Sequence, residues 1–310
     1  MRTIDAEHII PTLRKYELLR INQYGGYMTR TLAENYPYTK FYKAEIRAKQ
    51  QARQHWLQVV DDLENGKIDA DAALLYVLQL LWQLSEAFSN LVQKTLNSLE
   101  TWIDKNDPLS INSAIMLVKE HIEESEARAR LLEVAMHALL QALDELGVDL
   151  GGKLKPLMPM RTANKKHGNV GDVEVLSGNL HIEAWDAKYE QPYLSDALDE
   201  LAEKIHEHNI DVSELHFGYV LFPAKKTYPE VNHKIDDIDD RLGLRVQILA
   251  FDEWVHEQFI RSQNAGISKE NLTKAWLQAY TESLCLKRRD EAPIDEPTFD
   301  WVESLASKLA

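Results

Sequence analysis

The residues with the clearest chemical potential lie on a predicted β-hairpin in the middle of the chain. Asp172 stands at the start of one strand-like segment, and Asp186 and Lys188 stand near the end of the next. Side chains alternate faces along a strand, so Asp186 and Lys188 share one face with the apolar Ile182 and Ala184. We expect the hairpin to bring Asp172 and Asp186 together across the strand pair, which gathers two carboxylates and one ammonium.

This set of residue types predicts hydrolysis of a phosphodiester with Mg²⁺ as cofactor. Two carboxylates that converge on one point repel each other unless a cation lies between them. Mg²⁺ takes carboxylate oxygens, keeps several water ligands and binds phosphate. A lysine beside the metal can polarise a water molecule or hold it for attack. The alternative interpretation is that these residues have no catalytic role and form a surface salt bridge on a hairpin, which contributes little to stability.

The pattern resembles that of the PD-(D/E)xK nuclease superfamily, in which an acid on one strand is followed, after a hairpin, by Asp/Glu-x-Lys on the next. Gly171-Asp172 and Asp186-x-Lys188 match it, with Gly171 in place of the proline that usually precedes the first acid. The resemblance covers about residues 125–260. It implies that Asp172 and Asp186 ligate the metal and that Lys188 positions the attacking water.

An accessory helical region joined to such a core, in a single chain of this length, is most similar to a type II restriction endonuclease. The resemblance therefore implies sequence-specific hydrolysis of double-stranded DNA. Cleavage of both strands usually takes two active sites, so a homodimer is implied, and a methyltransferase encoded nearby would favour restriction over repair. Two other functions stay open: a DNA repair or antiviral nuclease without fixed sequence specificity, and a helical interaction protein with an inactive nuclease-like domain.

Further acids and one glutamine are candidates for the same site. Glu174 follows Asp172 by two positions and shares its face, so it is either a further metal ligand or the partner of a lysine. The resemblance adds Gln191, because some nuclease branches place a glutamine after the lysine. It also adds an acid from the preceding helix, for which Glu133 and Glu145 are both candidates.

A basic segment precedes the hairpin. The chain has 35 Lys and Arg against 50 Asp and Glu, a formal net charge of −15, yet residues 151–168 contain no acid. The segment is thus positively charged within an acidic protein, which indicates either contacts with phosphate groups beside the site or a solvated loop. The overall acidity argues mildly against a protein that coats nucleic acid, but not against an enzyme that grips it locally. The cations of the segment are Lys153, Lys155, Arg161, Lys165 and Lys166.

The composition is that of a globular protein of 310 residues, with 45% hydrophobic residues and a length that suggests about two domains. One cysteine, Cys285, excludes an internal disulfide and fits a reducing compartment. The apolar runs are too short to span a membrane, and the first residues lack the pattern of a signal peptide. We therefore expect a cytoplasmic protein without a membrane partner.

The expected fold class is α+β, with a helical region over residues 1–150 and a nuclease-like core over residues 151–310. The first region has helical periodicity over 41–63, 69–101 and about 110–146, and the second opens with the hairpin around Ser177-Gly178-Asn179. Strand–helix–strand spacing from 180 to 222 predicts a βαβ element in a mixed sheet flanked by helices. The remaining elements expected are helices at 194–208, 252–263, 268–288 and 298–309, and strands at 215–222 and 244–251.

Overall fold

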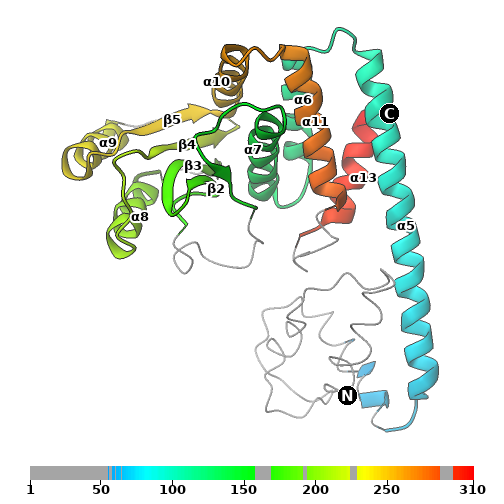
Figure 1. Ribbon diagram of the computed structural model, residues 1–310. Helices are drawn as coiled ribbons and strands as arrows, with labels where there is room; N and C mark the ends of the chain where they lie inside the picture. Colours follow the sequence, from blue (N-terminus) through cyan, green and yellow to red (C-terminus); the bar gives the residue numbers. More distant parts are fainter. Residues whose placement is uncertain are drawn as a thin grey trace. The chain divides into compact units, whose positions relative to one another are not determined.

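The computed structural model describes residues 55, 58–59, 61–63, 65–157, 169–190, 194–223, 229–286 and 296–310. The chain divides into two compact units: Met1–Asn90 with Arg289–Ile294, and Leu91–Arg288 with Asp295–Ala310. The sequence places a boundary near residue 150, whereas the helices between residues 91 and 150 belong to the second unit. That second unit contains the candidate site (Figure 1).

A mixed β-sheet forms the centre of the second unit, with five strands in the part of the chain that the structure describes. The strands lie in sequence order; β1, β2 and β3 are antiparallel neighbours, and β3, β4 and β5 are parallel neighbours. The α+β class is therefore confirmed. The short first strand was not expected from the sequence. The strands are β1 (Lys153–Leu154), β2 (Val173–Ser177), β3 (Leu180–Tyr189), β4 (His216–Phe222) and β5 (Val246–Ala250).

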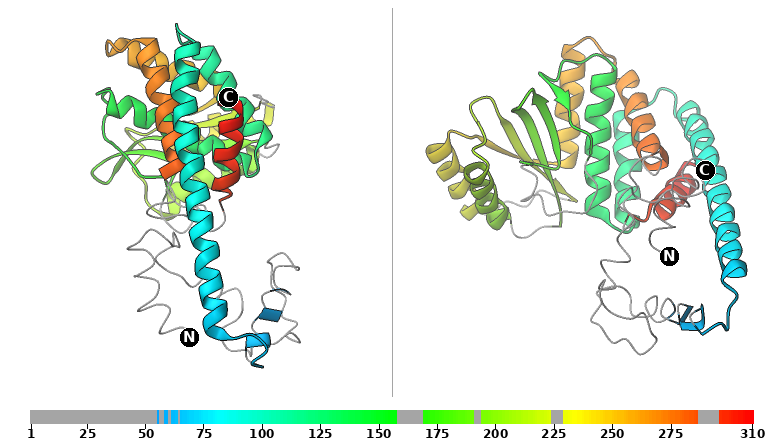
Figure 2. Two further views of the ribbon diagram at one scale, coloured as in Figure 1. Left: turned by 90° about the vertical axis from the view of Figure 1, so that its right-hand side faces the viewer. Right: turned by 60° about the horizontal axis from the view of Figure 1, so that its bottom comes forward.

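Helices cover both faces of this sheet. The predicted βαβ element is confirmed, because α8 (Leu194–Glu207) connects the parallel strands β3 and β4. A second crossover helix, α9 (Pro229–Leu242), packs beside α8 on the same face. The opposite face is covered by α7 (Arg128–Glu145) and α10 (Phe251–Asn264), as the second view in Figure 2 shows. Helix α9 was missed, although Val231, Ile235, Ile238 and Leu242 recur at helical spacing.

Further helices form a layer beyond α7. They are α6 (Ile111–Glu124), α11 (Lys269–Leu286) and α13 (Thr298–Leu309). The buried ring of His121 joins them, since it bonds the Tyr280 hydroxyl at 2.7 Å through Nδ1 and the Trp301 carbonyl at 2.8 Å through Nε2. Burial lowers the pKa of His121 to about 4, so this ring is neutral and Nε2 carries its proton.

The long helix predicted over residues 110–146 is wrong in one respect, because it is two helices. Ser110 caps α6 by accepting from the Ser113 amide at 3.0 Å. Helix α6 ends at Glu124, and Ala127 adopts a left-handed φ of 53° before α7 begins. Alanine is not a residue type that signals the end of a helix. Helical periodicity alone therefore predicts one continuous helix across this break.

The helix predicted from Asp69 is confirmed as α5 (Ala70–Lys105), and the Asp69 carboxylate accepts from the Ala72 amide at 2.8 Å. Most of the helix predicted over 41–63 lies outside the described residues. Among the helices that are described, none is both long enough and apolar enough to cross a membrane.

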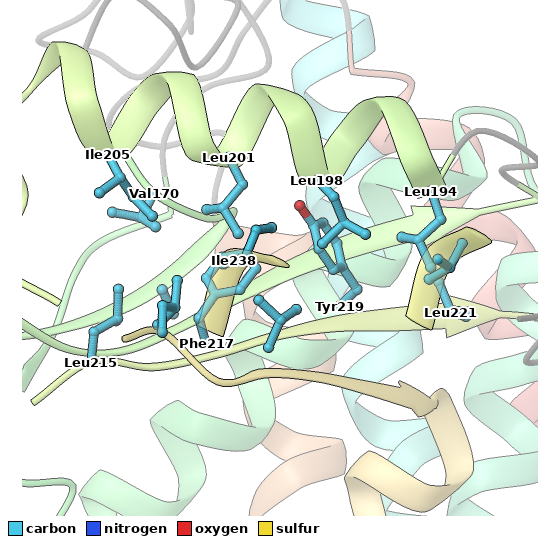
Figure 3. Packing of buried hydrophobic residues seen from close by; sticks show 14 residues of the cluster. Val170, Leu194, Leu198, Leu201, Ile205, Leu215, Phe217, Tyr219, Leu221 and Ile238 are labelled. Atoms are coloured by element: carbon cyan, nitrogen blue, oxygen red, sulfur yellow. The ribbon is translucent and has the colours of Figure 1, made fainter. Parts of the chain in front are cut away.

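The hydrophobic core between α8 and the sheet places the strand that carries Asp186. Residues of α8 at helical spacing point onto side chains of β4, and the Tyr219 hydroxyl reaches up toward the helix (Figure 3). That hydroxyl donates to the Ala197 carbonyl at 2.8 Å. The contacting helix residues are Leu194, Leu198, Leu201 and Ile205.

A close approach between β3 and β4 fills the other side of the sheet. The Trp185 indole lies against Gly218 on β4, where an added Cβ would come within 2.4 Å of the ring carbon Cζ3. The same indole packs edge-on against Trp254 of α10, with ring centroids 5.9 Å apart. A glycine at position 218 is therefore required by space.

We predict that Gly218→Ala lowers the free energy of unfolding by about 1–3 kcal/mol, because the new methyl group overlaps the indole. Chemical denaturation measures this loss. In a Trp185→Phe background, which removes the overlapping ring atoms, the same substitution should cost clearly less. An equal cost in both backgrounds would contradict this account.

Candidate active site at the β2–β3 hairpin

The backbone of β3 holds Asp172 in place. Asp172 immediately precedes β2; its amide donates to the Trp185 carbonyl at 2.9 Å. Its carboxylate Oδ2 accepts from the Ala187 amide at 3.0 Å, so the side chain continues the strand pairing where the backbone departs. Gly171 permits this approach, because a Cβ there would lie 2.7 Å from the Trp185 carbonyl oxygen. Asp172 is thereby fixed beside the end of β3.

Asp186 and Lys188 lie on the face of β3 that is covered by α8. Asp186 is almost completely buried, with 5% of its surface exposed, and its Oδ1 accepts from the Lys188 ammonium at 2.8 Å. In the parallel pairing with β4, Asp186 is opposite Tyr219. The Lys188 ammonium lies 5.6 Å from the centre of the Tyr219 ring. The structure therefore brings together the three residues predicted to carry the chemistry.

Asp186 is close enough to affect the ionisation of the Asp172 carboxyl. Burial raises the pKa of Asp172 well above its usual range, and repulsion from Asp186 and Glu133 raises it further. A hydrogen bond between the Asp172 and Asp186 carboxyls acts in the same direction, while Lys188 opposes it. Such a bond requires a proton on one of the two acids. The neutral form of the Asp172 carboxyl is therefore favoured, which avoids two negative charges at one point.

Lys188 keeps its positive charge in this setting. Burial is the largest single influence and acts to lower its pKa, but the charge and hydrogen bond of Asp186, together with weaker attractions, outweigh burial, so the pKa of Lys188 is raised. Asp172 and Glu200 of α8 add to the attraction. An ammonium with a raised pKa donates hydrogen bonds and does not accept protons near neutral pH.

Helix α7 supplies the acid that the sequence left undecided between Glu133 and Glu145. Glu133 acts on the ionisation of Asp172, whereas Glu145 is exposed at the end of α7 and accepts from Gln141 at 2.8 Å. Glu133 also forms an ion pair with the buried Arg130. A second carboxylate, Glu296, bonds the same guanidinium at 2.8 Å.

Glu174 faces a different set of partners. Its carboxylate accepts from the Lys155 ammonium at 2.8 Å and from the amides of Val170 and Gly171 at 2.6 and 3.3 Å. Of its two candidate roles, the structure shows the lysine pair. These bonds hold the turn that leads into Asp172, and they occupy both oxygens of Glu174.

The basic segment is only partly described. Lys153 is exposed on β1, and Lys155 is engaged by Glu174 and by the Asn169 side chain at 2.6 Å. The other candidates lie outside the described residues: Arg161, Lys165, Lys166 and Gln191.

Sequence reasoning missed Tyr219 and Glu200 as neighbours of the site. Tyr219 lies under Lys188, and burial raises its pKa well above the usual range. Both residues reach the site through the crossover of α8 and the register of β3 with β4. Only the alternation along residues 216–222, which puts Tyr219 on the α8 face with Phe217, was readable in advance.

The donor set suits one metal more than others. In the part of the chain that the structure describes, no three His, Cys, Asp or Glu side chains form a group that could hold a metal ion by themselves. Two carboxylates without histidine or cysteine do not fit a zinc site, which takes nitrogen and sulfur ligands. They do fit Mg²⁺, which uses one or two carboxylates and completes its shell with water and phosphate. The raised pKa of Asp172 marks the place where a cation would relieve the repulsion.

Comparison of the chain with known proteins gives no assignment: no protein-family model matches it, and no curated protein matches it.

We predict that Asp172→Asn flattens the loss of stability at rising pH. The raised pKa of Asp172 stabilises the fold below the ordinary carboxyl value of about pH 4, and this contribution is lost as pH rises through the raised pKa. Asparagine keeps an acceptor for the Ala187 amide and a donor for Asp186, without the charge. Thermal unfolding from acid to slightly alkaline pH measures the difference from wild type.

Asp211→Asn is the matched control for this experiment. Hydrogen bonds from Ser213 lower the pKa of the exposed Asp211, so its contribution is present above about pH 4 and is lost on acidification. The control should therefore change stability in the opposite direction with pH. If Asp172→Asn and wild type follow parallel curves across the whole range, the acid pair is not strained as described.

Proposed function

We propose that this chain is a Mg²⁺-dependent deoxyribonuclease of the PD-(D/E)xK type. The observation that carries the proposal is the convergence of two carboxyl groups at the end of β3: Asp172 accepts from the Ala187 amide, and Asp186, whose charge raises the pKa of Asp172, accepts from Lys188. Two buried acids in contact oppose folding unless a cation or a proton joins them. A fold that retains such a pair next to an ammonium is well suited to metal-assisted chemistry on phosphate.

The arrangement of the strands adds support. Asp172 immediately precedes β2, which pairs antiparallel with β3, the strand that carries Asp186 and Lys188. Helix α8 then leads to β4, which is parallel to β3. This is the mixed sheet flanked by helices that the resemblance to the superfamily implies. This chain has Gly171 where the superfamily usually has proline. The local reason is space, because any side chain at position 171 would overlap the Trp185 backbone.

Asp172 and Asp186 would hold the metal ion, while Glu133, which pairs with Arg130, acts on the ionisation of Asp172. Bound Mg²⁺ supplies a Lewis acid that polarises the phosphate and acidifies a water molecule. Lys188 stays protonated, so its ammonium orients the attacking water or a phosphate oxygen and does not remove a proton. Glu174 orders the turn before Asp172 and so positions that acid.

Among nucleases of this type, a sequence-specific type II restriction endonuclease is the finer proposal, and it rests on the resemblance and on the large helical part of the chain. A homodimer with two active sites, acting on both strands of duplex DNA, accompanies it. A methyltransferase encoded nearby belongs to the same proposal.

We predict that purified protein cleaves long unmethylated duplex DNA only with Mg²⁺ and that Asp186→Asn abolishes cleavage. Lys188→Met should reduce the rate by at least about a hundredfold, because it removes a charged donor from the developing negative charge. Asp211→Asn, which removes an exposed carboxylate held only by Ser213, should cleave like wild type. Gel electrophoresis of timed digests measures all four proteins.

The pattern of products separates the remaining possibilities. Discrete bands support a restriction enzyme, and a smear supports a repair or antiviral nuclease without fixed sequence. Folded wild-type protein that cleaves none of a set of DNA and RNA substrates overturns the nuclease proposal in favour of an interaction protein. Equal cleavage by wild type and Asp186→Asn would remove this site from the reaction.

We also predict that the apparent affinity for Mg²⁺ rises with pH. Because the pKa of Asp172 is raised, its carboxyl must lose a proton before it can ligate the metal, so metal binding releases a proton. Titration calorimetry in two buffers with different ionisation enthalpies measures this release without any substrate. The release should be absent in Asp172→Asn, and a wild-type affinity independent of pH would contradict the raised pKa of Asp172.

A further inference from the structure

Lys188 has two contacts of different kinds in the candidate site. Its ammonium donates to Asp186 Oδ1 at 2.8 Å, and the same nitrogen lies over the aromatic ring of Tyr219, 5.6 Å from the ring centre. That distance is within the range of a cation–π interaction, in which the negative face of the ring attracts a positive charge. Among the described residues, Asp186 is the only side chain that accepts a hydrogen bond from this ammonium. The ring is therefore the second anchor of the lysine.

The Tyr219 ring is itself held from two sides. The parallel register of β3 with β4 places Tyr219 directly opposite Asp186, and Lys188 shares that face because it lies two positions farther along β3. The Tyr219 hydroxyl reaches toward α8 and donates to the Ala197 carbonyl at 2.8 Å (Figure 3). Only 1% of the residue is exposed. The ring is thus a fixed and desolvated platform, on which cation–π attraction is strongest.

The two anchors respond differently to a metal ion at the acid pair. The Asp186 oxygen that accepts from Lys188 loses negative charge to a bound dication, and the ammonium is repelled by that dication. The ring face offers Mg²⁺ no oxygen ligand, so its attraction for the ammonium is retained. Glu200 of α8 also attracts the ammonium, but a charge that acts at a distance does not fix the position of the nitrogen.

We propose that Tyr219 is a positioning residue that keeps the Lys188 ammonium beside the acid pair when Asp186 ligates the metal ion. The inference rests on the proposed nuclease function, in which this ammonium orients the attacking water or a phosphate oxygen. The hydroxyl of Tyr219 is used by α8, so the ring alone holds the lysine. Phenylalanine can therefore replace tyrosine in this role, and leucine cannot.

Phe222 provides a matched control on the same strand. It lies three positions after Tyr219 and so on the other face of β4 from that ring, and it is also 1% exposed. It too lies under a lysine, with Lys119 Nζ 5.8 Å from its ring centre, and Lys119 is paired with Asp252 of α10. Phe222→Leu therefore removes an equally buried ring from beneath a different lysine.

The first test observes the position of Lys188 without any substrate, by NMR of protein labelled with ¹³C at the lysine ε carbons. Protons above an aromatic ring resonate upfield, and the Lys188 signal is the one that is lost in Lys188→Met. We predict an upfield signal in wild type, Tyr219→Phe and Phe222→Leu, both with and without Mg²⁺. Tyr219→Leu should move this signal to the ordinary lysine position. An unchanged signal in Tyr219→Leu, or loss of the upfield shift when Mg²⁺ is added to wild type, overturns the anchor.

The second test measures cleavage of duplex DNA at saturating Mg²⁺. Tyr219→Leu should lower kcat by about tenfold and leave KM for DNA nearly unchanged, because a misplaced ammonium weakens stabilisation of the transition state and not DNA binding. Tyr219→Phe and Phe222→Leu should cleave at close to the wild-type rate. Unfolding temperatures are recorded alongside, since a general loss of folding would lower the activity of both leucine variants.

The outcomes separate this inference from the function beneath it. Wild-type protein that cleaves DNA, with equal kcat in Tyr219→Leu and Phe222→Leu, overturns the positioning role and leaves the nuclease proposal standing. Wild-type protein that cleaves no DNA overturns the nuclease proposal and the role in that reaction. The NMR signal, which needs no substrate, still decides whether the ring holds Lys188 when Mg²⁺ is present.

Discussion

The contact between two buried carboxyl groups is the constraint around which the second unit is arranged. Asp172 is held against β3 by its own side chain, and Asp186 is buried beneath α8, so neither acid can move away from the other. The neighbouring groups then decide the charge: Lys188 compensates one carboxylate, and Glu133 adds to the repulsion. Stability is lost at this point of the fold, which is common where an enzyme binds a cation or a substrate.

The helices on the two faces of the sheet contribute differently to the surroundings of these carboxyl groups. The α8 layer supplies the apolar underside, because its leucines and Tyr219 exclude water from below the acids (Figure 3). The α7 layer supplies charge, through Glu133 and the cations near its start. Both sides of the sheet are nevertheless packed, since Leu131, Leu132 and Met136 of α7 are completely buried.

Much of this arrangement was predictable from local pattern. The hairpin, α8 and the strands on either side of it follow from alternation, turn residues and helical spacing, and so does the proximity of Asp172 to Asp186. The break at Ala127 was not predictable, since its left-handed backbone depends on how α6 and α7 pack and not on the residue type. The preference for Glu133 over Glu145 was equally hidden, because both acids lie on one helix and only tertiary packing selects one.

The ion pair of Arg130 with Glu296 connects the site to the far end of the chain. Arg130 is buried next to Glu133, and its second carboxylate lies 166 residues away, just ahead of α13. During synthesis on a ribosome, the strands and α7 emerge long before Glu296 does. A nascent chain can therefore assemble the hairpin before the charge balance around Arg130 and Glu133 is complete.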